Sequence, residues 1–494
     1  YGQGGTWGFH QQGTCYAVYD FLEDFCGVRW YSPTELGLDF IPRKTLTVEA
    51  KRIRRIPDSH HRMLIKELGV AQDFCGDTVD GGVTEVLDRR EMILWARRMR
   101  LGGTAFACNH SLYGYYARFL KTNPEWFAQG YEGRPPQLCY TAPGLIQQVA
   151  QDARDFFDGK LRLSSAYACG DFFSVMPMDN LQICKCPRCQ SLIKTGNHRG
   201  RGVYTDRLSK YYFSFVNQVA KELAKTHPGK WITTAAYNYS AYPPEEEKMA
   251  DNVAVVLCLG IRQPYNRERR ENDLEILRAW QNKAPDHIKS VWLYFCYPAL
   301  DAVGANERCF PGFFSRDLLA VLEEFRKSGI RGFIIEPSYM KGRVRNALMD
   351  QLELFLISKL FYNAGQDGKM LRNEFFQRYF GAAEAPMKQI YSEMEEAFCD
   401  ATVEYPDEGV QTQAVAWENL GTETRMNRWN ALFTTARGLA ENEKEKKRLE
   451  LFEKGIIRYM NAGREAYLQT VPVREKTAGR TILVPESKRD NWSE

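Results

Sequence analysis

The chain has 494 residues, of which 44% are apolar and 26% are charged, and its net charge is +4. This length predicts two or three domains rather than one. The small net charge and the lack of any apolar run near the roughly 20 residues that span a bilayer favour neither a nucleic-acid partner nor a membrane span. The 13 cysteines are scattered along the chain. Their odd number does not suggest a disulfide framework and by itself indicates a reducing compartment.

Residues 1–56 are interpreted as the C-terminal part of a small α/β domain. Apolar residues recur at helical spacing over 13–27, and short strands are predicted at 28–33 and 45–50. One helix and two strands cannot bury a core alone, so we expect this unit to be incomplete. The opening residues contain no charged and apolar stretch of the kind found in signal peptides.

Residues 57–345 alternate between apolar runs and amphipathic segments, which predicts an α/β fold. The strands are expected at 61–69, 104–110, 137–141, 164–179, 230–240, 252–261, 290–298 and 331–338. Eight continuously apolar strands separated by helices are typical of a (β/α)8 barrel of the TIM type. An open, doubly wound sheet is the alternative, but no glycine-rich phosphate motif follows any strand. Residues 346–494 are predicted to be mostly helical, and the absence of a linker suggests that they pack on the barrel.

In such barrels, reactive side chains come from the carboxyl ends of the strands. The strand ends carry carboxylates, amides, cations and aromatic rings that suit a polyhydroxylated substrate. The predicted substrate-binding residues are Arg62, Glu67, Asn109, His110, Tyr237, Tyr239, Trp292 and Tyr294. Aromatic rings there would stack on sugar faces, although such rings more often fill cores.

The predicted catalytic residues are Glu336, Asp179 and Asn180. Glu336 follows four apolar residues and precedes a proline, which predicts a carboxylate at the barrel rim. Glycoside hydrolysis needs a general acid and a group that stabilises the anomeric centre. We expect Glu336 to donate the proton and Asp179, with Asn180, to hold the acetamide of the sugar itself. A structural ion pair for Glu336 and a helix-capping role for Asp179 remain the alternatives.

Three cysteines, Cys184, Cys186 and Cys189, form a C-x-C-x2-C array directly after this segment. Their spacing suits zinc, but a structural zinc site needs a fourth ligand, for which Cys139 and His198 are the candidates. Packed or free thiols are the competing interpretation, and a thiol nucleophile is disfavoured because no histidine is near in sequence. We predict no cofactor, with a structural zinc ion at this cluster as the alternative, and in either case a structural role for the three cysteines.

Several motifs resemble known families. The stretch 16–33, YAVYDFLEDFCGVRWYSP, is similar to the end of the small α/β domain of α-glucuronidases and β-hexosaminidases. WARRMRLGG, QLCYT with PGL, SVMPMDN with CKCPRC, and FFQRYFGAA resemble the bacterial domain family of unknown function 4838 (DUF4838). Part of that family is glycoside hydrolase family 163, endo-β-N-acetylglucosaminidases of gut Bacteroidetes that cut complex N-glycans.

The resemblance implies a retaining, substrate-assisted hydrolase that acts on a glycan or glycoprotein and is periplasmic, cell-surface or secreted. This expectation replaces the reducing compartment suggested by the cysteines. Where β-hexosaminidases carry Asp–Glu, this chain has Asp179–Asn180. That departure motivates the main alternative, a non-catalytic glycan-binding protein. Another glycosidase, such as an α-glucuronidase, is a third interpretation.

Overall fold

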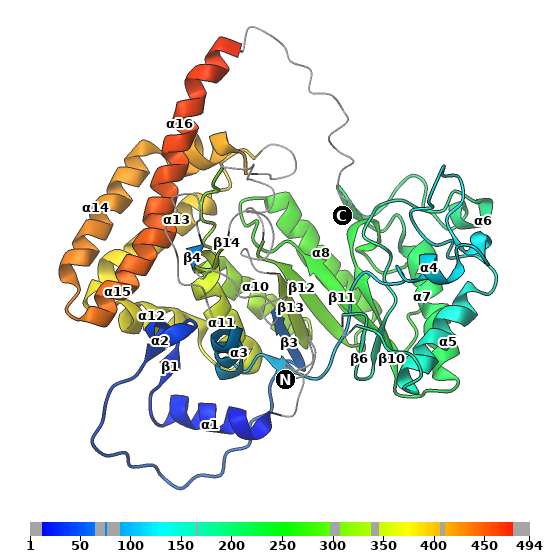
Figure 1. Cartoon of the computed structure of the whole chain (residues 1–494), viewed down its shortest axis with the longest axis horizontal. Helices are drawn as coiled ribbons and strands as arrows, with labels where there is room; N and C mark the ends of the chain where they lie inside the picture. Colours follow the sequence, from blue (N-terminus) through cyan, green and yellow to red (C-terminus); the bar gives the residue numbers. More distant parts are fainter. Residues whose placement is uncertain are drawn as a thin grey trace.

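The structure is a computed structural model that describes residues 12–64, 75–76, 89–164, 166–296, 307–336, 345–405 and 411–477. Its centre is a curled, eight-stranded sheet, with the C-terminal helices on one side and the elements between residues 111 and 224 on the other (Figure 1). In spatial order the strands are β5 (Gly102–Gly103), β3 (His61–Leu64), β13 (Gly332–Glu336), β12 (Lys289–Tyr294), β11 (Val253–Leu259), β10 (Trp231–Ala236), β7 (Phe172–Ser174) and β6 (Ala168–Cys169).

The six inner strands are parallel, and the two edge strands are antiparallel to their neighbours. In the described residues no pairing joins β5 to β6. The α/β class is therefore confirmed as a curled sheet, whereas the closed eight-stranded barrel is not.

The inner strands are mostly apolar because both faces of the sheet are covered. On β11, Ala254, Val256 and Cys258 belong to a small cluster on the concave side, together with Phe106 and Ile334. The alternate residues of the same strand belong to the main core beneath the helices. The continuous apolar runs that predicted parallel strands are explained by this two-sided burial.

Two expected strands do not join the sheet. Segment 104–110 has no strand structure, and its Phe106 belongs to the small cluster on the concave side, where it stacks on His61 with ring centroids 3.8 Å apart. Its backbone is held at one end by Thr104 N–H, which donates to the His60 carbonyl. Further along, Ala107 accepts a hydrogen bond from the Thr233 side chain, so side chains replace part of a strand ladder. Segment 137–141 makes only an isolated bridge from Leu138 to Phe127.

The expected strand over 164–179 is instead a tight hairpin of β6 and β7. The turn places Gly170 at φ +60°, where a side chain would also collide with Ala105. A glycine at this position allows the reversal that local apolar content does not reveal.

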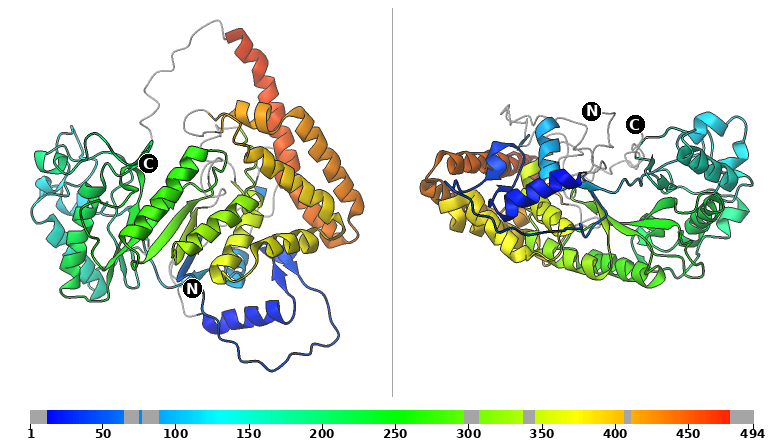
Figure 2. Two further views of the ribbon diagram at one scale, coloured as in Figure 1. Left: turned by 180° about the vertical axis from the view of Figure 1, so that it is seen from behind. Right: turned by 90° about the horizontal axis from the view of Figure 1, so that it is seen from below.

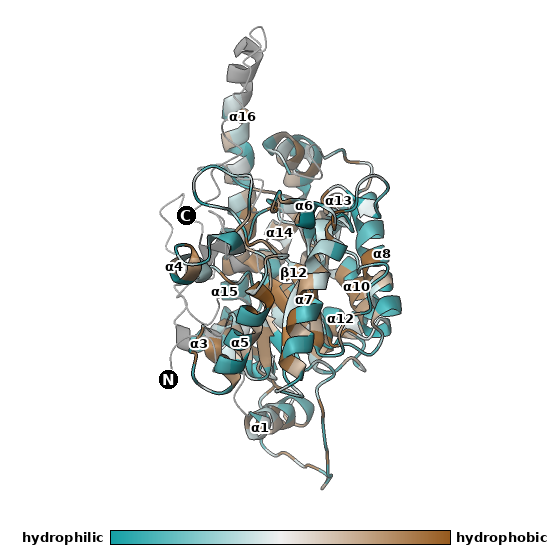
Figure 3. Cartoon of the chain, turned by 90° about the vertical axis from the view of Figure 1, so that its right-hand side faces the viewer, coloured by the Kyte–Doolittle hydropathy of each residue, from teal (hydrophilic) through white to brown (hydrophobic). Residues whose placement is uncertain are grey.

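Helices of the central region cover the convex face of the sheet, with their apolar sides inward and their polar sides outward (Figure 3). The helices that do so are α5 (Leu145–Phe157), α7 (Ser209–Ala224), α8 (Arg267–Lys283) and α10 (Ser315–Lys327). By contrast, α3 (Arg89–Arg98) packs against the N-terminal part, and the short α4 (Tyr115–Phe119) and α6 (Pro187–Gln190) lie away from the sheet (Figure 1). Short elements connect them: η3 (Pro124–Trp126), η4 (Asn238–Ser240), the pair β8 (Gly200–Arg201) and β9 (Tyr204–Thr205), and the pair β4 (Cys75–Gly76) and β14 (Arg345–Asn346).

The C-terminal part is helical, as predicted. Its elements are η5 (Ala347–Asp350), α11 (Gln351–Tyr362), α12 (Gly368–Phe380), η6 (Gly381–Ala383), α13 (Glu384–Phe398), η8 (Val415–Leu420), α14 (Glu423–Leu439), α15 (Glu443–Phe452), η9 (Glu453–Arg458) and α16 (Tyr459–Thr477). One apolar core runs from the sheet into these helices. In the described residues, no helix is both long enough and apolar enough to cross a membrane.

The N-terminal part contains α1 (Gly13–Asp24), β1 (Arg29–Trp30), α2 (Thr34–Gly37) and β2 (Leu38–Asp39). The strand expected at 45–50 is not formed, because β1 pairs with β2 and residues 45–50 are mostly exposed chain. This part lies beside α11 and α12 (Figure 2).

Candidate functional site

The carboxyl end of the sheet places a carboxylate beside aromatic rings. Glu336 is the last residue of β13 and is only 3% exposed. Trp292 Nε1 of the neighbouring strand donates a hydrogen bond to Glu336 Oε2 at 3.1 Å. Tyr294 lies opposite Glu336 in the strand register, and its ring centroid is 6.5 Å from that of Trp292. Three predicted residues are thus brought together by adjacent parallel strands.

A second carboxylate lies at the opposite side of the curl. Asp179 Oδ1 is 3.2 Å from His110 Nε2, and the Asp179 side chain is 60% exposed. His110 Nδ1 lies 2.6 Å from the Pro177 carbonyl, so it carries the proton and donates. The ring of Tyr237 meets His110 edge-on, with centroids 5.8 Å apart. His110 is thereby oriented toward the carboxylate of Asp179.

The loop that carries Asp179 is held by amide side chains. Gln137 Nε2 donates to the Met178 carbonyl at 2.6 Å and to Asn180 Oδ1 at 3.2 Å. Asn180 Nδ2 in turn donates to the Pro136 carbonyl at 3.1 Å. Both ends of the Asn180 amide therefore help to hold the loop that carries Asp179.

A hollow of about 60 Å³ opens beside this loop. Four of the predicted residues line it: His110, Asn180, Tyr237 and Tyr239. Gln137, which the sequence analysis missed, lines it as well. A buried amide in a segment expected to be a strand gave no local signal that it faces a site.

Both carboxylates raise the pKa of one buried thiol, that of Cys258. Burial raises the pKa of Cys258 on β11 well above its ordinary value, and the nearby Cys108, Glu336 and Asp179 raise it further. Burial likewise raises the pKa of Tyr294, with contributions from Cys258, Tyr237 and Glu336. Glu336 and Asp179 therefore both lie within electrostatic range of Cys258.

Three predicted residues have other roles or positions. Arg62 is buried on the opposite face of β3, where its Nε donates to the Arg100 carbonyl at 2.7 Å, so it supports the fold. Asn109 Oδ1 accepts a hydrogen bond from the His110 amide and orients that turn. Glu67 lies outside the described residues.

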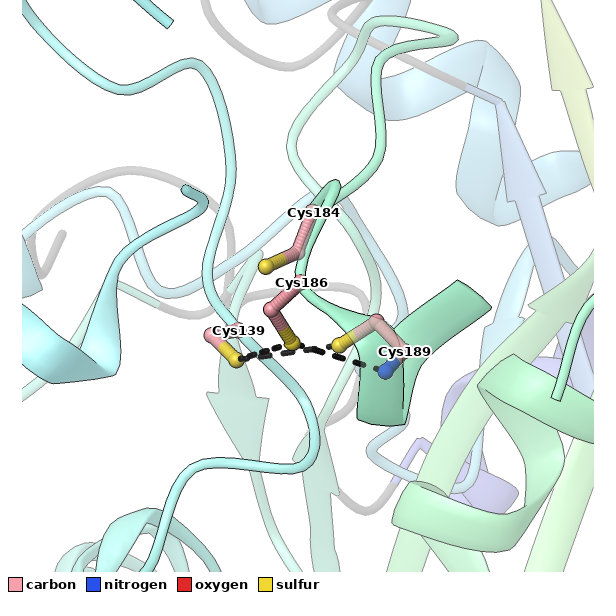
Figure 4. A group of neighbouring side chains, drawn as sticks. All are labelled: Cys139, Cys184, Cys186 and Cys189. Carbon is pink, nitrogen blue, oxygen red and sulfur yellow. Dashed lines mark hydrogen bonds between the residues drawn. The ribbon is translucent and has the colours of Figure 1, made fainter. Parts of the chain in front are cut away.

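The cysteine array is completed by a fourth thiol. Cys139, Cys184, Cys186 and Cys189 are all buried, and their sulfur atoms lie within 4.8 Å of one another (Figure 4). Cys139 approaches from one chain segment and the other three from another. His198, the other candidate ligand, is exposed and contacts the Gly196 carbonyl instead. A buried cluster of four thiols is able to hold a metal ion.

The fold and the site define an α/β protein whose curled parallel sheet presents a carboxylate and aromatic rings at the carboxyl ends of its strands. More specifically, residues 42–393 match the family described as Domain of unknown function (DUF4838), and the chain belongs to this family. No curated protein is similar enough to match the chain.

Proposed function

We propose that the protein is a glycoside hydrolase that acts on N-acetylglucosamine-containing glycans. The observation that carries the proposal is the buried Glu336 carboxylate, which is held by Trp292 beside an aromatic ring at a strand end. A sugar needs both a proton donor at its glycosidic oxygen and flat apolar surfaces under its ring. The resemblance of several motifs to glycoside hydrolase family 163 supports the same reaction class.

In this proposal the curled sheet serves as a barrel-like catalytic scaffold, in which segment 104–110 occupies the gap between β3 and β7. The support is that this segment bonds to both sides of the gap. Thr104 N–H donates to the His60 carbonyl beside β3, and the Ser174 hydroxyl of β7 donates to the Asn109 carbonyl at 2.7 Å.

The proposed reaction is retaining and assisted by the substrate. Glu336 donates its proton to the leaving glycosidic oxygen while the acetamide oxygen attacks the anomeric carbon and the C–O bond breaks. Asp179, held by His110 and by its loop, stabilises the positive charge that develops on the acetamide. Water then opens the cyclic intermediate, and Glu336 takes back a proton. The resemblance to glycoside hydrolase family 163 supports an exported enzyme that cleaves inside complex N-glycans.

A second candidate is a glycan-binding protein without catalysis. It is favoured by the environment of the second carboxylate, since Asp179 is 60% exposed and the amide of Asn180 is used within the loop. A different specificity, such as that of an α-glucuronidase, is a third possibility.

The test is to incubate the protein with a complex N-glycoprotein and to detect released glycan by mass spectrometry. Glu336→Gln is expected to lower the rate by about 10²–10⁴-fold, because general acid catalysis contributes that much. The loss should be much smaller with an activated aryl glycoside, whose leaving group needs no proton. Trp292→Phe keeps a ring but removes the donor to Glu336, so it should lower the rate less than Glu336→Gln.

Glu246→Gln, at an 81% exposed carboxylate on the surface, is the matched control and should leave the rate unchanged. Binding of the glycoprotein without release of glycan would favour the binding protein. Hydrolysis of aryl glucuronides, but not of aryl N-acetylglucosaminides, would instead favour the α-glucuronidase.

A further inference from the structure

The four buried cysteines have the dimensions of a tetrahedral metal site. Cys139 Sγ is 3.6 Å from Cys189 Sγ and 3.8 Å from Cys186 Sγ. Four sulfurs each 2.3 Å from a central zinc ion lie about 3.8 Å from one another in a tetrahedron. A disulfide would bring two sulfurs to about 2.05 Å, and the described cysteines form none.

The surroundings of the sulfurs suit thiolates. The backbone N–H of Gln129 donates to Cys184 Sγ at 3.3 Å, and the backbone N–H of Cys189 donates to Cys186 Sγ at 3.4 Å. The Thr141 hydroxyl lies 3.1 Å from Cys189 Sγ. Donors around the ligands orient them and spread the negative charge that four thiolates would carry.

Apolar packing does not account for this arrangement. Elsewhere in the described chain, buried cysteines such as Cys108 and Cys258 are surrounded by Phe, Ile, Met and Val side chains, as small hydrophobic residues are. The four clustered sulfurs instead converge on one point from two segments, with Cys139 lying 47 residues before Cys186. Four ligands of this kind leave no open coordination position, which is the pattern of a structural site.

We propose that Cys139, Cys184, Cys186 and Cys189 bind one zinc ion as four thiolates, in a closed site that holds the Asp179 loop in place. The ion would link segment 137–141 to segment 184–189. The side-chain amide of Gln137, two residues before Cys139, donates to the backbone carbonyl of Met178, next to Asp179. The backbone N–H of Lys185 donates to the backbone carbonyl of Gln129. The metal would therefore support one wall of the hollow without touching the substrate.

Elemental analysis of the intact, purified chain tests this proposal independently of any hydrolase activity. We expect one zinc ion per chain, released when a mercurial reagent modifies the thiols. Replacing zinc by Co²⁺ should give the strong visible absorption of a tetrahedral site and thiolate-to-metal charge transfer. Cys186→Ser should lose the metal and lower the melting temperature. Cys169→Ser, which removes a buried thiol outside the cluster, should retain one ion per chain.

If Cys186→Ser does not fold, the wild-type stoichiometry and the cobalt spectrum still decide the question. A wild-type chain without metal that takes up none after reduction would overturn the proposal, as would mass evidence for disulfides among the four cysteines. Zinc retained at full stoichiometry in Cys186→Ser would also overturn it. A chain that holds zinc in this site but cleaves no glycan would leave this inference standing and refute only the hydrolase.

Discussion

Among the described residues, no cation forms a hydrogen bond with the buried carboxyl group of Glu353 on α11. Its Oε1 accepts a hydrogen bond from the Phe314 amide at 3.0 Å, and its Oε2 has no hydrogen-bond partner among the described residues. Burial raises its pKa from 4.5 to about 7, and nearby Arg262 only partly offsets this. Because the folded chain then holds a proton that the unfolded chain releases, stability is expected to fall as pH rises from about 4.5 to 7.

Glu353→Gln should remove this pH dependence, since the amide is neutral and its oxygen can still accept from Phe314. At pH 8 the variant should be more stable than the wild type by up to about 3 kcal/mol, and near pH 5 by little. Urea unfolding at both pH values measures the difference. The exposed Glu450→Gln on α15 serves as the control. An equal difference at both pH values would contradict the assignment.

At the scale of elements, Arg262 joins three segments at the carboxyl edge of the sheet by hydrogen bonds. Its guanidinium donates to the carbonyls of Gly312 and Phe295, each at 2.8 Å, and of Met349 at 2.7 Å, and it pairs with Asp350. The clamp joins the end of β12 to the segments before α10 and α11. Both members of the ion pair are buried.

Arg262→Met should therefore lower the free energy of unfolding by about 3–5 kcal/mol, because Asp350 keeps its buried charge and loses its arginine. Changing Asp350 to Leu as well should restore part of the loss, since a buried apolar pair costs less than a broken ion pair. Urea denaturation of both variants measures this. Arg326→Met, at a surface pair with Glu323, should change stability little. A small loss in Arg262→Met would show that the clamp is dispensable.

At the scale of the whole molecule, the described N-terminal residues 12–56 form no separate core and pack on the C-terminal helices, with Trp30 and Tyr31 in the main core. Arg29 forms two hydrogen bonds with Glu374, at 2.7 and 2.9 Å. Arg378 contacts Asp39 at 2.7 Å, and the fully buried Arg448 donates to the Leu36 carbonyl. These contacts explain how so small a unit stays ordered.

Limited proteolysis should therefore yield no stable fragment of residues 57–345. The sheet and the C-terminal helices share one core, so cutting between them would expose a large apolar surface. Mass spectrometry of the protease-resistant products is the measurement. A folded 57–345 fragment free of the helical part would show that the two parts are separate domains.

The sequence by itself determined the elements whose signal is local. Apolar runs predicted β10, β11, β12 and β13, because a strand that is buried on both faces is apolar along its length. Apolar residues at helical spacing predicted α7 and α10, because a helix that is buried along one stripe repeats apolar residues every three to four positions. Glu336 at a strand end was predictable for the same reason. The three clustered cysteines were visible as a motif, and Cys139 was one of two candidates for the fourth.

Only the tertiary structure decided what depends on distant partners. An apolar run such as 104–110 is suited to a strand, but whether it pairs depends on the neighbours that chain folding supplies, here the side chains of Thr233 and Ser174. Arg62 faces the helices rather than the site because of the pleat and register of β3. Gln137 donates a hydrogen bond to Asn180, and Cys139 rather than His198 joins the three clustered cysteines. Both contacts join residues that lie more than 40 positions apart in the sequence, so no local pattern predicts them.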